Sequence, residues 1–376
     1  MVISIFLILL YQKKGKKIKM GRRNNNGGGT KILIAILLVL IIAAGALLAM
    51  RYFQDQSVGE ETLNTKIENK EEEKKPVTFA GTDRPIAVMI DNHQNAMPQA
   101  NLSEAELVYE MIVEYGETRL MAIYKGDDLD KIGPIRSARH YFVDYALEND
   151  AIYVHYGESP QAEEAIQRYG LPSINGINES EDLFWRVDDK YAPHNAVTST
   201  KNILEIANRE GYRTTSNKES VLNYVVDEVN LDEGQSAIDI TIPYSQYNTV
   251  RYEYDEESKT YIRYSRDEKQ VDWDTGETVT VKNIIIAKVE NSTLNDGSDK
   301  DRQTIDNIGT LDGYYITNGK AIEIKCKKTS ANEQTVYEDL NGNEIKVNDG
   351  NTFIQMCPID SEIVIEGNSE EVNSEE

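Results

Sequence analysis

The sequence predicts an α+β protein, in which one transmembrane helix precedes an N-terminal α/β domain with a mixed sheet and a β-rich C-terminal domain. Three observations predict this fold class. A long apolar run lies near the N-terminus, apolar stretches alternate with helical patterns over residues 81–215, and period-2 alternation fills residues 236–366. Alternating strand and helix signals are typical of an α/β layer, whereas short alternating strands between turns are typical of a β-rich domain.

The apolar run predicts a membrane-spanning helix at residues 32–53. Its first nineteen residues, ILIAILLVLIIAAGALLAM, carry no charge, and at about 1.5 Å of rise per residue they match the hydrocarbon core of a bilayer. Eight Lys and Arg residues precede the run and only Arg51 follows closely. The excess of positive charge before the run predicts a cytoplasmic N-terminus and globular domains outside the cell.

The flanking segments are expected to lie outside the folded domains. Residues 1–31 form a basic cytoplasmic segment, in which MGRRNNNGGGTK from Met20 resembles a normal start. Residues 1–19 are therefore interpreted as a mis-called gene start, with a second hydrophobic segment as the alternative. Residues 54–80 contain KIENKEEEKK and predict a charged flexible linker, and residues 367–376 predict an acidic tail.

Charge and cysteine content exclude several functions. The net charge is −24, and all 64 Asp and Glu residues follow residue 51 together with only 31 of the 40 Lys and Arg residues, so nucleic acid is not an expected partner of the acidic globular part. Cys326 and Cys357 are the two cysteines of the chain; they either form a disulfide or stay free, and they cannot build a metal site alone. The sequence has no phosphate-binding loop, dinucleotide fingerprint or calcium loop, so no cofactor and no metal is predicted.

The individual elements follow from local patterns. In the first region, strands are predicted at 86–90, 110–115, 119–124 and 151–156, and helices at 103–109, 137–148, 160–169 and 200–209. The helix at 103–109 rests on a capping box formed by Ser103 and Glu106. In the second region, strands are predicted at 251–254, 261–264, 283–289, 313–317, 321–325, 335–338 and 352–357. The tyrosines of the first two alternate with charged residues, which predicts a hairpin with one solvated face.

Arginine-rich motifs in the first region predict an anion-binding site. The ligand-binding candidates are Arg119, Arg136, Ser137, Arg139, Arg186 and Asn195. Guanidinium groups bind carboxylate or phosphate through paired N–H donors, and a helix that begins near Ser137 would add backbone donors. In the alternative interpretation, the arginines pair with buried carboxylates at Glu110, Glu114 or Asp144.

The four histidines of the chain all fall in the first region, several at predicted strand ends where α/β folds assemble their sites. His155 and His194 could form an acid/base pair or a metal site with Asp91 or Glu114. These four residues are the catalytic candidates. The alternative is a structural histidine that hydrogen-bonds to a carboxylate.

Two nucleophiles are weaker candidates. Ser137 lies between two arginines and Cys326 follows a predicted strand, but neither has an elbow motif or a base that the sequence reveals. A core position is the favoured interpretation for Cys326.

A string of motifs gives the chain a family resemblance. RPIAVMIDNH, LVYEMIVEYGETRLMAIY, DKIGPIRSARHYF, AIYVHYG and APHN occur in this order, followed by VKNIIIAKV, ITNGKAIEIKCKK and TVYEDLNGNEIKVNDGNTFI. Over residues 84–353 the sequence resembles the YerB-like putative lipoprotein family of Gram-positive bacteria, whose function is unknown. Members with a lipidated cysteine differ from this chain, which has no cysteine near its apolar run.

The resemblance implies two tandem domains outside the membrane and no established reaction. The polar positions that match the family are Asp91, Asn92, Glu110, Glu114, Thr118, Arg119, Arg136, Ser137, Arg139, His155, Arg186, His194 and Asn195. We expect a single-pass membrane-anchored protein of the cell envelope that binds an anionic ligand, such as a cell-wall polymer, or a wall-synthesis protein. The alternative is an envelope hydrolase or transferase that uses His155, His194 and a nearby carboxylate.

Overall fold

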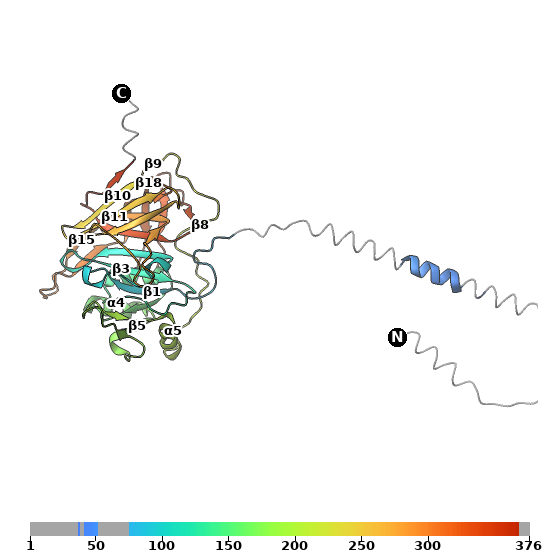
Figure 1. Cartoon of the computed structure of the whole chain (residues 1–376), viewed down its shortest axis with the longest axis horizontal. Coiled ribbons are helices and arrows are strands. Elements are labelled where there is room, and N and C mark those ends of the chain that lie inside the picture. The colour runs from blue at the N-terminus through green and yellow to red at the C-terminus, as the bar shows by residue number, and fades with distance from the viewer. Residues whose placement is uncertain (1–36, 38–40, 52–74, 368–376) are drawn as a thin grey trace, which may run out of the picture. The chain divides into compact units, whose positions relative to one another are not determined.

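The computed structural model describes residue 37 and residues 41–51 and 75–367 (Figure 1). Residues 37 and 41–51 are helical. Within these described ranges no helix has both the length and the apolar character needed to cross a membrane, so the predicted transmembrane helix at 32–53 is not supported. The remaining residues of that segment, the basic segment 1–31, most of the linker and nearly all of the acidic tail lie outside the described residues.

From residue 75 to residue 367 the chain is dominated by strands, with three α-helices in this range. The helices are α3 (His140–Glu148), α4 (Pro160–Tyr169) and α5 (Thr200–Arg209). The strands are β1 (Ile86–Asp91), β2 (Leu107–Ile112), β3 (Thr118–Tyr124), β4 (Ile152–His155), β5 (Ser173–Asn175), β6 (Trp185–Arg186), β7 (Ala196–Val197), β8 (Tyr224–Val225), β9 (Gln235–Ser236), β10 (Asp239–Ser245), β11 (Asn248–Asp255), β12 (Thr260–Ser265), β13 (Glu268–Lys269), β14 (Thr280–Val281), β15 (Asn283–Thr293), β16 (Gln303–Asp306), β17 (Gly309–Thr317), β18 (Lys320–Lys328), β19 (Val336–Asp339), β20 (Val347–Asn348), β21 (Thr352–Pro358) and β22 (Val364–Glu366).

One large sheet runs through both predicted regions. Its strand order is β19-β18-β17-β15-β21-β2-β3-β1-β4-β5, with β16 paired to β15 and β9 paired to β18. Strand β21 lies between β15 and β2 and is parallel to both. A strand from the end of the chain thereby joins the first region to the second through a continuous hydrogen-bonded sheet.

The predicted N-terminal α/β domain was therefore wrong. Its strands belong to this larger sheet, in which β3 pairs antiparallel with both β1 and β2. Apolar runs such as IAVMI suggested a parallel sheet covered by helices, because strands buried on both faces lose their polar alternation. Here the strands are buried on both faces for a different reason: helices cover one face and a second sheet covers part of the other.

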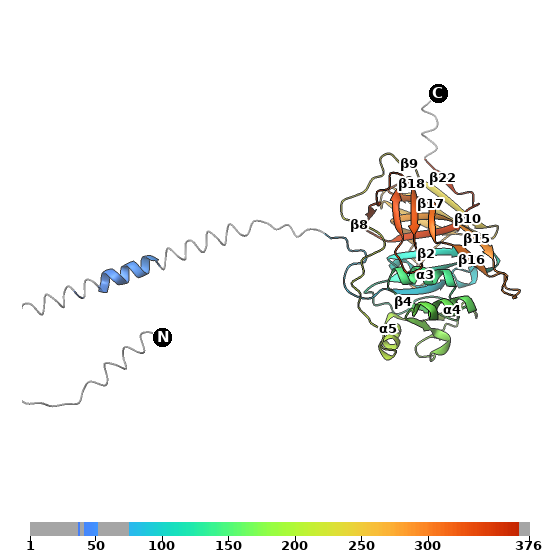
Figure 2. The same cartoon turned by 180° about the vertical axis from the view of Figure 1, so that it is seen from behind.

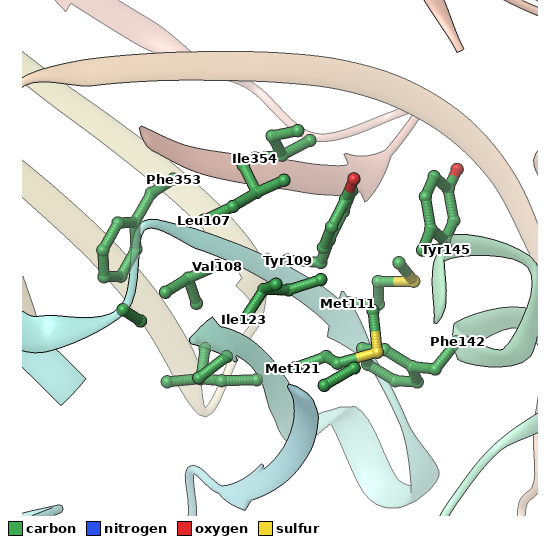
Figure 3. Packing of buried hydrophobic residues seen from close by; sticks show 14 of the residues in the cluster. Leu107, Val108, Tyr109, Met111, Met121, Ile123, Phe142, Tyr145, Phe353 and Ile354 are labelled. Carbon is green, nitrogen blue, oxygen red and sulfur yellow. The ribbon is translucent and has the colours of Figure 1, made fainter. Parts of the chain in front are cut away.

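The second sheet has the strand order β13-β12-β11-β10-β22, with β14 paired to β12. Tyr252 and Tyr244 of this sheet hydrogen-bond to Gln355 of β21, while Tyr145 of α3 packs against Tyr109 of β2 from the opposite side, with the rings tilted by 38°. Figure 2 shows α3 near β2, and Figure 3 shows Tyr109 facing Tyr145 in the core. Since side chains alternate between the faces of a strand, the two sides of the sheet receive different partners.

Several local predictions were confirmed. Helices α4 and α5 have the predicted bounds, and the hydroxyl groups of Ser159 and Ser199 cap their N-termini. Strands β11 and β12 form the predicted antiparallel tyrosine-rich hairpin. Cys326 and Cys357 are free and buried, and burial raises the pKa of each thiol to about 12. An inert core position fits both thiols better than nucleophilic chemistry.

The predicted helix at 103–109 was wrong. Residues Leu102–Glu104 form a single 3₁₀ turn, and the chain then enters β2 at Leu107. A capping box needs a helix behind it, and the following sequence LVYEMI is rich in residues that favour a buried strand. Glu106 caps nothing here; its Oε2 atom is buried and has no hydrogen-bond partner among the described residues.

The replacement Glu106→Gln is expected to stabilise the protein at pH 8 and to have no effect at pH 4. Burial raises the pKa of Glu106 from 4.5 to about 7, so between these values the unfolded state ionises before the folded state and stability falls as the pH rises. The expected gain at pH 8 is about 1–2 kcal/mol. Urea unfolding at both pH values measures it. Exposed Glu104, replaced by Gln, serves as the control, and an equal gain at pH 4 would contradict the explanation.

Candidate functional site

A polar cleft with a volume of about 590 Å³ opens where β1 ends and β3 begins. Its lining residues are Asp91, His93, Val113, Glu114, Tyr115, Glu117, Thr118, Arg119, Arg136, Ser137, Arg139, Glu158, Ser159, His194, Lys300 and Arg302. Asp91 and Arg119 are direct neighbours in the β1–β3 register. The sheet therefore holds a carboxylate and a guanidinium side by side at the base of the cleft.

Asp91 forms the centre of the first polar cluster. Its Oδ2 atom lies 2.7 Å from Nδ1 of His194 and 3.2 Å from Nε of Arg136, and its Oδ1 atom accepts the backbone N–H of His93 at 3.1 Å. Burial raises the pKa of the Asp91 carboxyl, but the hydrogen bond with His194 and the charge of Arg136 outweigh burial, so the net pKa is lowered. Asp91 is thus an ionised carboxylate that only accepts hydrogen bonds.

Glu114 forms the second cluster with two arginines. Its two oxygens accept Nε and Nη2 of Arg139 at 2.6 and 2.8 Å, and Nη2 of Arg119 lies 3.4 Å from Oε2. Burial raises the pKa of Glu114, but Arg139 and Arg119 lower it more. Burial and the neighbouring Arg139 lower the pKa of Arg119 to about 10. These two arginines neutralise a buried carboxylate, as one of the two interpretations of the sequence expected.

The turn that carries Glu114 depends on an unusual backbone. Tyr115 and Gly116 both have positive φ values, 61° and 76°, a region that favours glycine. A side chain at Gly116 would approach Oγ of Ser245 to 2.8 Å. The tight turn therefore sets Glu114 into the cleft while Tyr115 stays exposed at the rim.

Arg136 and Lys300 are two basic side chains of the cleft that keep free donors. Apart from the contact of its Nε with Asp91, Arg136 has no side-chain hydrogen bond to any described residue, and 26% of its side chain is exposed. Lys300 is exposed and has no ion-pair or hydrogen-bond partner within the described ranges. Both can bind an anion without first breaking a protein contact.

Lys300 reaches the cleft on the loop between β15 and β16. The backbone N–H of Tyr115 donates to Oδ2 of Asp301 and its phenol donates to the carbonyl of Asp299, both at 3.1 Å. Arg302 on the same loop donates to Asp296 at 2.6 Å. These contacts fix the loop against the first region, so one wall of the cleft comes from the second half of the chain.

Comparison with known proteins identifies the family. Residues 68–213 match the N-terminal domain, and residues 240–354 the C-terminal domain, of the family described as "Protein of unknown function (DUF3048)". The chain is 31% identical over 270 residues to the "Putative lipoprotein YerB" of Bacillus subtilis. The aligned residues cover 71% of this chain and 76% of the relative. The chain belongs to the YerB-like family. The crystal structure of the YerB protein from Bacillus subtilis superposes with a TM-score of 0.69 at 29% identity, covering 77% of this chain and 99% of that one.

Seven of the ten candidate residues of this YerB-like chain line the cleft. They are Asp91, Glu114, Arg119, Arg136, Ser137, Arg139 and His194. Ser137 is no evident nucleophile, because its hydroxyl donates to the carbonyl of Tyr156 at 3.0 Å.

The other three candidates lie elsewhere. Nδ1 and Nε2 of His155 are 2.8 Å from the Gly157 carbonyl and the Ser173 hydroxyl, and burial lowers the pKa of His155 to about 4. Arg186 donates to Asn195 outside the cleft. His155 and His194 therefore do not share a site. No group of three or more His, Cys, Asp or Glu residues in the described part could hold a metal ion.

Sequence reasoning missed three residues that line this cleft. His93 stacks on His194 with a centroid distance of 4.3 Å and an interplanar angle of 15°. Lys300 and Arg302 lie more than a hundred residues from the other lining residues. His93 could have been predicted from the sequence, since it follows β1 two residues after Asp91. No local signal connects the β15–β16 loop to the cleft.

Proposed function

We propose that this YerB-like protein acts in the cell envelope by binding an anionic group, phosphate or carboxylate, in the cleft. The observation that carries the proposal is the guanidinium of Arg136, which faces the cleft with free Nη donors. Lys300 adds a second cation from the loop between β15 and β16. A concave site with a few convergent polar groups is the usual form of a ligand site, and a planar guanidinium suits both oxyanions.

The charge distribution supports this proposal. The cleft lining carries five basic and four acidic side chains, so its formal charge is positive, although the whole chain has a net charge of −24. Glu114 is neutralised by Arg139 and Arg119, and Glu117 pairs with Arg266. Asp91 is shared between Arg136 and His194, and Arg136 contacts it only through Nε, so the Nη donors of Arg136 and the charge of Lys300 stay available to an anion from solution.

The proposed location is the outer side of the cell membrane. The relative from Bacillus subtilis is named a putative lipoprotein, and a membrane-attached extracytoplasmic position is consistent with that name. A cell-wall polymer or a protein of wall synthesis would meet the cleft there. We retain the division of the chain into two tandem parts, residues 81–215 and 236–366, as part of this proposal. Both parts contribute residues to the proposed ligand site.

The replacement Arg136→Ala is expected to weaken the binding of inorganic phosphate by roughly tenfold to a hundredfold, the value of one or two charge-assisted hydrogen bonds. Thermal stability should change little, because Arg136 is partly exposed and makes one long contact. Isothermal titration and a melting curve measure the two effects. Arg119 is unsuited to this test, because its removal would also leave buried Glu114 with one partner fewer.

Arg186→Ala is the matched control for this experiment. Arg186 is an exposed arginine outside the cleft, so its removal should leave phosphate binding unchanged. Equal phosphate affinity of wild type and Arg136→Ala, or binding of neither inorganic phosphate nor acetate by the wild type at millimolar concentration, would refute the proposed function.

A second candidate function is an envelope hydrolase or transferase. The Asp91–His194 hydrogen bond of 2.7 Å favours it, since a carboxylate that orients an imidazole is a common acid/base arrangement. This version relies on His194 without His155, which lies in a separate environment. The two functions differ in one observable: an enzyme converts its ligand, whereas a binding protein releases it unchanged.

A further inference from the structure

We infer that the ligand of the cleft carries a hydroxyl group next to its anionic group, as polyol phosphates and sugar acids do, and that His194 accepts the hydrogen bond of that hydroxyl. This inference rests on the proposed anion binding and specifies its ligand class. It follows from the hydrogen-bonding state of three neighbouring side chains.

The first step concerns the proton on His194. Nδ1 of His194 lies 2.7 Å from Oδ2 of Asp91, and the pKa of Asp91 is lowered, so that its carboxylate is ionised. An ionised carboxylate can only accept a hydrogen bond. Nδ1 therefore carries the proton, and in the neutral ring Nε2 is left with a lone pair.

The second step concerns the direction of that lone pair. The two ring nitrogens of an imidazole point away from one another, so Nε2 points away from buried Asp91. His194 lines the cleft, and Nε2 has no hydrogen-bond partner among the described residues. The cleft thus offers one nitrogen acceptor to its ligand.

The third step is the arrangement of this acceptor beside the cation. Nε of Arg136 lies 3.2 Å from the same Asp91 oxygen that binds His194, so the guanidinium and the imidazole are held next to each other. An ionised alkyl phosphate or carboxylate without a hydroxyl group would satisfy Arg136 and leave Nε2 of His194 without a donor. A ligand with a hydroxyl group beside the anion satisfies both groups at once.

His93 supports the arrangement as a positioning residue. Its ring stacks on that of His194, while its own Nδ1 accepts the backbone N–H of Asn95 at 3.1 Å. That hydrogen bond fixes the plane of the His93 ring. The stack then limits rotation of His194, which keeps Nε2 aimed in one direction.

The test compares matched pairs of small anions at pH 8. Glycerol 3-phosphate is compared with propyl phosphate, and glucuronate with tetrahydropyran-2-carboxylate, by isothermal titration. Within each pair only the hydroxyl groups differ. We expect the hydroxylated member of at least one pair to bind roughly threefold to tenfold more tightly, and the pair that shows the preference identifies the ligand as a polyol phosphate or a sugar acid.

Two variants connect the preference to His194. His194→Phe should reduce the affinity ratio to about one, whereas His140→Phe, which removes a histidine outside the cleft, should leave it unchanged. Nitrogen-15 spectra of the wild-type ring provide a measurement that needs no variant, with a proton expected on Nδ1 and none on Nε2.

The outcomes separate this inference from the proposed function. If propyl phosphate and glycerol 3-phosphate bind equally and neither carboxylate is preferred, anion binding stands and the inference is overturned. A ring that carries its proton on Nε2 would overturn it as well. If none of the four anions binds, the proposed function itself fails and the inference falls with it.

Discussion

Replacing Arg263 with methionine is expected to lower the free energy of unfolding by about 3–5 kcal/mol. Arg263 of β12 and Glu110 of β2 form an ion pair at 2.6 Å, and neither side chain is exposed to solvent. Removal of the cation would leave a buried carboxylate with only neutral donors, Asn92 at 3.1 Å and Thr118 at 2.8 Å. Since a typical domain has about 5–15 kcal/mol of stability in total, this is a large fraction.

Urea unfolding, followed by fluorescence, measures this loss. Arg251→Met is the matched control, because Arg251 is also an arginine of the second sheet whose ion pairs are partly exposed, and its loss should cost at most about 1 kcal/mol. The double replacement Glu110→Gln with Arg263→Met should recover part of the stability. An Arg263 variant as stable as the Arg251 variant would show that the buried pair contributes little.

The second large effect is expected at the opposite side of the main sheet. Lys328→Met should destabilise the protein by about 3–5 kcal/mol, because Nζ of Lys328 binds Oε2 of Glu148 at 2.7 Å and both side chains are almost fully buried. Glu148 also accepts the hydroxyl of Tyr109 at 2.7 Å and the backbone and hydroxyl of Thr335 at 3.0 and 2.7 Å. Without the lysine, these neutral donors would face an unpaired charge.

Lys327→Met is the matched control for Lys328. The two lysines are adjacent in β18, but their side chains point to opposite faces of the strand, and Lys327 is 43% exposed in its pair with Glu338. Chemical unfolding of both variants at the same pH compares them directly. A similar small loss for each would contradict the role assigned to the buried pair.

The sequence was sufficient for elements that depend on local chemistry. Helices α4 and α5 were predicted with their bounds, because a serine cap and an amphipathic pattern define each of them. The capping box at Ser103 and Glu106 gave a wrong prediction because it is only a local signal. The burial of β2 in the sheet outweighed it.

The assembly of the sheet could not be predicted. Nothing in LVYEMI shows that its neighbour is β21, more than two hundred residues away. The candidate site was predicted in part, since its arginines and Asp91 lie on adjoining strands and loops of the first region. Lys300 and the stacking of His93 on His194 depend on tertiary contacts that have no counterpart in the local sequence.

The position of β21 has a consequence for biosynthesis. Its partners β2 and β15 come earlier in the chain, so neither has its full set of hydrogen bonds until residues 352–358 have been synthesised. Until then both strands have unpaired, apolar edges. In other proteins, unpaired strand edges of this kind promote aggregation. Such late pairing between distant segments is also slow. The main sheet is therefore completed only after β21 has been synthesised, and a chain that stops short of β21 lacks the strand that joins β2 to β15.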